Sequence, residues 1–148
     1  MKKISSVICL SFIVILLFVT PVLGSSDWMK YEVDNEGNVH FYKKGSIDKE
    51  GGNYIVQVWD KWVYSDKGRE TYIQLLRKRG RSAEEYDKMS YDIVLREIDC
   101  KKNRNRTMDT FIYDMDNKLI DSSSNKGLEW NYIVHNSVGD SFRKKVCP

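Results

Sequence analysis

Residues 1–24 have the features of an export signal, and the compartment that they specify constrains the rest of the chain. Lys2 and Lys3 form a positively charged start, an uncharged apolar run extends from Val7 to Val19, and Val22-Leu23-Gly24 offers small or apolar residues at the cleavage positions. We therefore expect cleavage after Gly24 and delivery of the remaining chain outside the cytoplasm.

An uncleaved membrane anchor is the alternative, because an apolar segment of this length approaches what a helix needs to span a bilayer. Pro21 and Gly24 argue against such a helix. A lipid anchor is not expected, since Cys9 lies within the apolar run and no cysteine follows that run at a processing point. We expect no stable membrane insertion after cleavage.

The mature chain, residues 25–148, has the length of one domain. Lys2 and Lys3 leave with the signal while no acidic residue does, so the net charge falls from +3 to +1. All tryptophans and tyrosines lie in the mature part, and such residues suit the half-buried surfaces of a β-sheet.

The mature chain keeps two cysteines, Cys100 and Cys147. An even pair in an oxidising compartment predicts a disulfide. In the chain-entropy model, a bridge that closes so long a loop stabilises the fold by roughly 4 kcal/mol. A redox or metal role is not favoured, because the pair forms no CxxC motif and no histidine stands near it.

Alternating and β-rich segments predict an antiparallel sheet of about six strands. The segments 28–33 and 39–43 flank glycine and Asx residues that are typical of a hairpin turn. The run from Tyr54 to Tyr64 has apolar residues on both faces, which predicts a central strand. On that strand, Trp59 should be more buried than the loop residues beside it. Further strands are expected over residues 90–100, 104–113, 118–121 and 130–133, with turns at 44–47, 51–53 and 114–117.

Two segments have the apolar spacing of helices. Tyr72, Ile73, Leu75 and Leu76 predict a short middle helix that ends near Gly80. The sequence from Ser82 to Glu85 has the form of a capping box and predicts another turn of helix after it. A C-terminal helix with one apolar stripe is expected over 137–147, where Ser137 is followed three residues later by Asp140. The expected fold class is therefore α+β.

The chain carries no clear catalytic signature. His40 and His135 are its only histidines, and they belong to no HExxH or paired-histidine motif, so neither a metal site nor a cofactor is predicted. No Gly-x-Ser-x-Gly elbow is present. Asp114 and Asp116 lack the glycine and later acid of a calcium loop and are better explained as hairpin-turn residues. An enzyme is not the favoured interpretation.

The order of these features resembles the surface-adhesin protein E-like family of secreted bacterial proteins over essentially the whole mature chain. The residues that carry the resemblance are Trp28, Phe41-Tyr42, Gly45-Ser46-Ile47, Val58-Trp59, Tyr64, Glu97-Ile98-Asp99-Cys100, Arg104, Arg106, Trp130, Ile133, Ser137 and Cys147.

This resemblance implies an antiparallel sheet backed by helix and a disulfide between the last helix and a strand end. It also implies an adhesive role, because the member that gives the family its name binds host matrix proteins. The chain departs from the family in lacking a lipidation cysteine, and Val134-His135-Asn136 stands where the family tends to have a proline before the serine.

The predicted disulfide brings two basic runs together, because the α-carbons of bridged cysteines lie about 6 Å apart. We expect a basic patch that favours anionic partners such as sulfated glycans or acidic protein surfaces. The alternative is that these side chains only keep one end of the sheet solvated. The residues of the predicted basic patch are Lys101, Lys102, Arg104, Arg106, Arg143, Lys144 and Lys145.

These observations predict a secreted or cell-envelope binding module that adheres to an extracellular macromolecule. The expected partners are an extracellular matrix-like protein, an anionic glycan or another envelope protein, and a homodimer is left open. The compartment excludes nucleic acid. The alternative function is a periplasmic accessory or small-ligand-binding domain without an adhesive role. The sequence leaves open whether the mature chain is periplasmic, held at the cell surface or secreted.

Overall fold

The computed structural model describes residues 27–43, 48–49, 54–124 and 129–148. The predicted export signal and the predicted turns at 44–47 and 51–53 lie outside the described residues.

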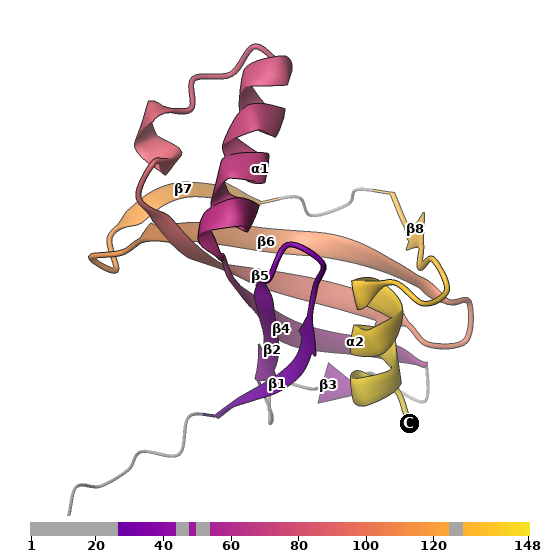
Figure 1. The fold of residues 1–148 in the computed structure, drawn as a ribbon. Helices are drawn as coiled ribbons and strands as arrows, with labels where there is room; N and C mark the ends of the chain where they lie inside the picture. The colour runs from indigo at the N-terminus through magenta and orange to yellow at the C-terminus, as the bar shows by residue number, and fades with distance from the viewer. Residues whose placement is uncertain (1–26, 44–47, 50–53, 125–128) are drawn as a thin grey trace, which may run out of the picture.

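Within the described residues, the strands form one antiparallel sheet in the order β1-β2-β4-β5-β6-β7 (Figure 1). Two short strands extend it, with β3 beside β4 and β8 beside β6. The strands span Trp28–Val33 (β1), Val39–Lys43 (β2), Asp48–Lys49 (β3), Ile55–Val63 (β4), Met89–Asp99 (β5), Arg104–Asp114 (β6), Leu119–Ser124 (β7) and Asn131–Tyr132 (β8).

The two hairpin turns at 34–38 and 114–118 are built in the same way. The Asp34 carboxylate accepts hydrogen bonds from the backbone N–H groups of Glu36 and Asn38, each at 2.9 Å. Asp114 accepts in the same way from Asp116 and Lys118. Each aspartate thus satisfies turn amides that would otherwise lack partners, which is why Asx residues favour such turns. The prediction that Asp114 and Asp116 form a hairpin turn is confirmed.

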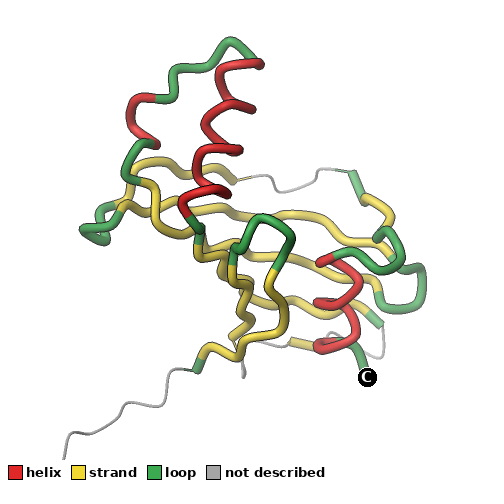
Figure 2. Tube along the Cα trace, in the orientation of Figure 1, coloured by secondary structure: helices red, strands yellow, loops and turns green. Residues whose placement is uncertain are grey.

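Two α-helices and one 3-10 turn are present in the described chain (Figure 2). Helix α1 spans Asp66–Lys78, and the Ser65 hydroxyl caps it by accepting from the Gly68 N–H. Helix α2 spans Val138–Val146 and is capped by Ser137, whose side chain accepts from the Asp140 N–H. The turn η1 covers Glu84–Tyr86.

Both helices pack on the same face of the sheet, which we call the helix face. Phe142 and Val146 of α2 pack against Val56, Val58 and Ile98 near one end of β4 and β5. A second cluster joins α1 to the sheet at the other end, where Ile73 and Leu76 meet Met89 and Ile112. Because strand side chains alternate, the intervening residues of β4, β5 and β6 point to the opposite face, which we call the open face.

The disulfide joins the end of β5 to the end of α2. Cys100 follows Asp99 directly, Cys147 follows Val146, and their α-carbons are 5.7 Å apart. An isolated helix as short as α2 is not stable in water. Burial of its apolar stripe and the covalent bridge therefore hold it on the sheet, as the resemblance implied.

The predicted α+β fold, with a middle helix, a C-terminal helix and a disulfide, is confirmed. Strand β3 was not expected. The predicted capping box at Ser82 is wrong, since η1 begins at Glu84 after Ala83 and makes no side-chain cap hydrogen bond. Trp59 is half-buried on the open face, whereas Tyr54 just before β4 is 58 % exposed. The expectation that Trp59 is more buried than the neighbouring loop residues is confirmed.

We predict that replacing both Cys100 and Cys147 by Ala lowers the free energy of unfolding by about 2–4 kcal/mol, because the unfolded chain regains the freedom that the bridge removes. Urea unfolding of the wild type and the variant measures this difference. As a control, thiol titration of the denatured, unreduced wild type should find no free thiol. Two titratable thiols per mature chain would contradict the bridge.

Candidate functional site

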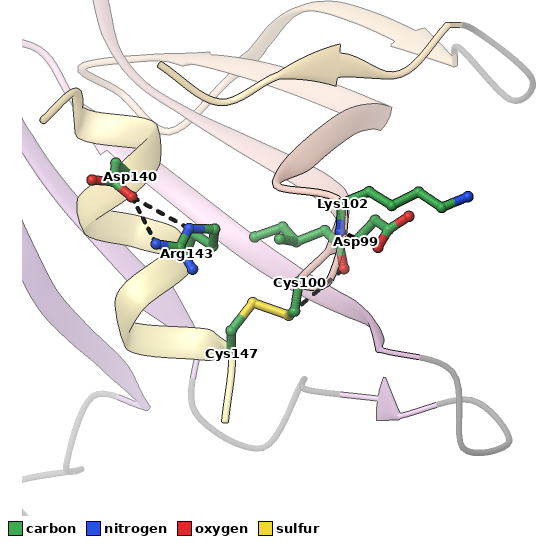
Figure 3. The surroundings of a disulfide bond; sticks show 7 residues. Asp99, Cys100, Lys102, Asp140, Arg143 and Cys147 are labelled. Atoms are coloured by element: carbon green, nitrogen blue, oxygen red, sulfur yellow. Dashed lines mark hydrogen bonds and ion pairs between the residues drawn. A yellow bond between two sulfur atoms is a disulfide. The ribbon is translucent and has the colours of Figure 1, made fainter. Parts of the chain in front are cut away.

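The disulfide brings the backbones of the two predicted basic runs together, but the cationic side chains diverge. Figure 3 shows Lys102 pointing away from α2, while Arg143 lies along the helix beside Asp140. Lys101, Lys102 and Asn103 form the tight turn between β5 and β6. Proximity of the two cysteines therefore does not by itself merge the cations into one surface.

Arg104 and Arg106 lie on the open face, because Asn105 between them faces Phe142 of α2 across a small pocket. The Arg104 Nε donates to Asp99 at 3.0 Å, and the Arg106 Nε donates to Glu97 at 2.6 Å. Both guanidinium carbons lie 4.7 Å from the centre of the Trp130 ring. These two arginines neutralise acidic neighbours on β5 and hold Trp130 over the sheet end.

The cationic side chains of α2 pair with a different acidic residue, Asp140. Asp140 is 2 % exposed. Its carboxylate accepts a hydrogen bond from Arg143 at 2.9 Å and lies 2.8 Å from the Lys144 ammonium. Hydrogen bonds from Lys144, Arg143 and the Asn136 N–H hold the pKa of Asp140 well below its usual value. Removing these cations would leave a buried carboxylate without its counter-charges.

The remaining cations of the predicted basic patch are the exposed Lys101, Lys102 and Lys145. Lys101 lies 5.9 Å from the centre of the Tyr54 ring. The structure thus divides the seven residues between the open face, the β5–β6 turn and α2. Binding of an anionic partner by this patch stays a prediction.

The open face is rich in aromatic side chains, and no described helix covers it. One row across the sheet runs through Lys30, Phe41, Lys61, Ile93 and Phe111. In the neighbouring rows, Trp59 lies 6.3 Å from Phe111, and Tyr91 stacks on Tyr113 at 5.0 Å between ring centres. A shallow hollow of about 270 Å³ lies among Trp28, Lys43, Trp59, Ile93, Phe111 and Tyr113.

Lys61 is at the centre of the open face. Its ammonium lies 4.1 Å from the centre of the Tyr91 ring and 5.9 Å from that of Trp28. Partial burial lowers the pKa of Lys61. The ring contacts favour the charged form, since aromatic faces attract cations. The open face therefore combines aromatic rings with positive charge.

The helix face carries a groove between α1 and the strands, with a volume of about 450 Å³. Asp92, Val94 and Arg96 of β5 contribute to it with residues of β6. Tyr72 of α1 lines one side, and Trp62 and the adjacent Tyr64 line the other. This volume falls in the range of small-molecule sites, roughly 300–1,000 Å³.

Asp92 lies in this groove and is 7 % exposed. Its Oδ2 accepts from the Tyr64 hydroxyl at 2.9 Å, whereas its buried Oδ1 has no hydrogen-bond partner. Burial raises the pKa of Asp92 to about 7, and the charge of Asp60 acts in the same direction, while the Tyr64 hydroxyl, the charge of Arg96 and the Trp62 backbone oppose the rise. This carboxyl therefore changes its charge near neutral pH.

A second buried carboxylate, Asp60, is fully paired. It is 1 % exposed and accepts from the Tyr31 hydroxyl at 3.1 Å, from the Trp62 indole at 2.6 Å and from Arg96 at 2.9 Å. Burial and the Asp60 charge raise the pKa of Tyr31 far above its usual range, so its hydroxyl stays a donor. Asp60 and Arg96 thus form an ion pair without net charge beneath α2.

Sequence reasoning missed the groove, because Asp60 and Asp92 lie on different strands whose register places them near each other. One signal was present, since each aspartate interrupts an apolar position of a β-rich run. Buried carboxylates rarely occur without partners, so such positions merit attention in other sequences.

His40 is buried on β2 and contacts the Asp34 carboxylate at 3.1 Å, and the exposed His135 contacts Asp140 at 3.3 Å. Among the described residues, no group of three or more His, Cys, Asp or Glu side chains is arranged to hold a metal ion. None of the helices in the described ranges has the length and apolar character to cross a membrane.

Residues 28–148 match the family described as surface-adhesin protein E. No curated protein and no solved structure matches the chain.

We predict that Asp92→Asn changes how stability depends on pH. The native Asp92 carboxyl keeps its proton up to about pH 7, whereas an ordinary aspartate loses it near 3.8. The native state therefore holds the extra proton between these values, and the Asp92 contribution to the free energy of unfolding falls as the pH rises through this window. The wild type should lose roughly 4 kcal/mol more than the variant between about pH 4 and pH 8.

Urea unfolding at several pH values in this window measures the difference. Asp109→Asn on the open face is the matched control and should follow the wild type. Identical pH profiles of wild type and Asp92→Asn would show that burial does not perturb this carboxyl.

Proposed function

Because the chain belongs to the surface-adhesin protein E family, we propose that it is an exported adhesion module that binds an acidic extracellular protein through its open face. Membership of this family indicates an adhesive, non-catalytic role. The partner and the binding surface are the parts that we add.

The observation that carries the proposal is the composition of the open face. Phe41, Trp59, Ile93, Phe111 and Tyr113 are half-buried there, and no described helix packs over them. Contiguous aromatic surface of this kind marks interaction sites, because leaving it in water is unfavourable. Aromatic residues are also the commonest anchors of protein interfaces.

Charge selects the kind of partner. Lys30 and Lys61 stand on either side of Phe41 in one row of the sheet, which gives the aromatic surface a positive potential. Complementary potentials speed association and exclude partners of like charge. An acidic protein surface with apolar side chains at its centre fits both features.

Export is part of the proposal. A disulfide persists in oxidising compartments, which supports delivery of the chain beyond the cytoplasm. We propose that residues 1–24 are removed as the signal and that residues 25–148 act at the cell surface or after secretion.

The proposal predicts that the mature protein binds at least one member of a panel of immobilised acidic matrix proteins, and that the paired change Lys30→Glu with Phe111→Thr weakens this binding about tenfold or more. The first change reverses a charge and the second removes an aromatic anchor, while threonine keeps the preference for a strand. Surface plasmon resonance measures the affinities, and circular dichroism checks that the variant is folded.

The matched control replaces Lys101, Lys102 and Lys145 by Ser and should bind as the wild type does. Loss of binding in this control but not in the paired variant would move the interaction to the predicted basic patch. Heparin serves as a second ligand, and preference for heparin over every protein in the panel would favour an anionic glycan as the partner.

A second candidate function is a periplasmic domain that binds a small ligand. The groove on the helix face favours it, because that groove has a suitable volume and contains a buried carboxyl with an unpartnered oxygen. Location separates the two candidates. Degradation by external protease on intact cells supports surface adhesion, whereas release only with the periplasmic fraction supports the second candidate.

A further inference from the structure

The groove on the helix face has an apolar lining, a polar floor and an acidic mouth. Leu75, Val94 and Ile112 supply apolar surface from α1, β5 and β6. Asp34 and Glu36, from the turn between β1 and β2, contribute the acidic side chains. A ligand that fits this groove therefore has an apolar body and favours a negative environment.

The unpartnered oxygen of Asp92 supplies the anchoring point. Buried polar atoms nearly always have a hydrogen-bond partner, and an exception calls for an explanation. The Cβ–Cγ torsion of an aspartate has a broad energy well, so a small rotation can keep the bond to Tyr64 and turn the other oxygen toward the groove. A bound group that donates hydrogen bonds would satisfy this oxygen.

Aromatic rings surround the same position. Trp62 pairs with Asp92 across the β4–β5 ladder, Tyr64 donates to its carboxyl, and Tyr72 of α1 lies 6.0 Å from Tyr64 between ring centres. Tryptophan and tyrosine faces attract cations, and the attraction is stronger in a desolvated site. Arg96 already lies 5.5 Å from the centre of the Trp62 ring, so the two tyrosine rings and the Asp92 carboxyl are the groups that offer a site for a further positive charge.

The one cation among the described residues that line the groove is Arg96. Its charge is already paired with Asp60 at 2.9 Å, and it also donates to Thr107 at 3.1 Å. The carboxylates of Asp34, Glu36 and Asp92 therefore outweigh it in the groove. An anionic ligand would meet repulsion at the mouth.

We propose that this groove binds an organic ammonium group, with the Asp92 carboxylate as counter-ion and Tyr64 and Tyr72 as its aromatic walls. The apolar part of the ligand lies against Leu75, Val94 and Ile112. A free alkylamine and the lysine side chain of a bound protein present the same chemistry. The proposed function of the open face does not depend on this site.

Binding is coupled to the charge of Asp92. The charged or titratable groups around it are Asp60 on β4, Tyr64 after β4, Tyr72 on α1 and Arg96 on β5. Asp34 and Glu36 also line the groove, and the buried His40 contacts Asp34. Because burial raises the pKa of Asp92 to about 7, the carboxylate that an ammonium group needs becomes abundant only above neutral pH. Affinity should therefore be about tenfold higher near pH 8 than near pH 6.

The test compares three small probes with the mature protein, with isothermal calorimetry and intrinsic tryptophan fluorescence, to which Trp62 in the groove contributes, as readouts. Pentylamine represents the free amine, N-acetyl-lysine methylamide represents the protein side chain, and 1-pentanol is the neutral match. Both amines should bind with the stated pH dependence, and pentanol should bind at least tenfold more weakly. Binding of only one amine identifies the source of the ammonium group.

Three variants locate the binding. Asp92→Asn removes the counter-ion and should weaken amine binding at least tenfold near pH 8 while abolishing its pH dependence. Thr71→Trp fills the groove from an exposed position of α1 and should block binding in a protein that keeps its fold. Asp109→Asn on the open face and the Lys30→Glu, Phe111→Thr variant should both bind amines as the wild type does.

The proposal is overturned if neither amine binds at millimolar concentration, if pentanol binds as tightly as pentylamine, or if Thr71→Trp leaves amine binding intact. Amine binding that survives in Asp92→Asn with an unchanged pH profile would also overturn it, since His40 or another group would then be responsible. If the Lys30→Glu, Phe111→Thr variant still binds matrix proteins, the proposed function of the open face is wrong, but the amine-binding results are unaffected. The two proposals can therefore be tested separately.

Discussion

The antiparallel ladder between β4 and β5 is the constraint on which the rest of the structure depends. It runs from the pair Ile55 and Asp99 to the pair Val63 and Tyr91, so it fixes the facing of every side chain in the centre of the sheet. A shift by one residue would exchange the two faces. With the register as it is, Val56, Val58 and Ile98 meet α2, while Trp59 and Lys61 point away from both described helices.

This division explains why the two faces have different chemistry. On the helix face, carboxylates are buried and each needs a partner, because an unpaired charge in an apolar environment is costly. Asp60 and Asp140 obtain several hydrogen bonds from charged or aromatic donors, whereas Asp92 interacts with the Tyr64 hydroxyl and the Trp62 backbone, keeps one oxygen unpartnered and holds its proton to higher pH. Of these three carboxylates, Asp92 is the one with an unpartnered oxygen.

On the open face, charged side chains are in contact with solvent and neighbouring aromatic rings, whereas on the helix face the side chains are covered by helices. Lys61 over Tyr91 and the arginines beside Trp130 are examples of cations that lie against aromatic surface. Arg104 and Arg106 pair with the buried Asp99 and the half-buried Glu97, so each arginine supplies the counter-charge of an acidic side chain that is largely removed from water. This pairing neutralises one end of the open face and leaves positive charge near Lys30 and Lys61.

Local sequence signals determined the elements of this protein. Asp34 and Asp114 with their turn residues specified two hairpins, Ser65 and Ser137 specified two helix starts, and the even cysteine pair specified the disulfide, because each signal acts through neighbours a few residues away or through a single covalent bond. Only the tertiary structure decided which face each side chain occupies. Trp59, Arg104 and Asp92 illustrate this. The alternation of side chains along each strand predicts which residues share a face, but not which face the helices cover. The placement of the helices made Trp59 part of the open face and separated Arg104 from Lys144. It also buried Asp92 with one oxygen unpartnered.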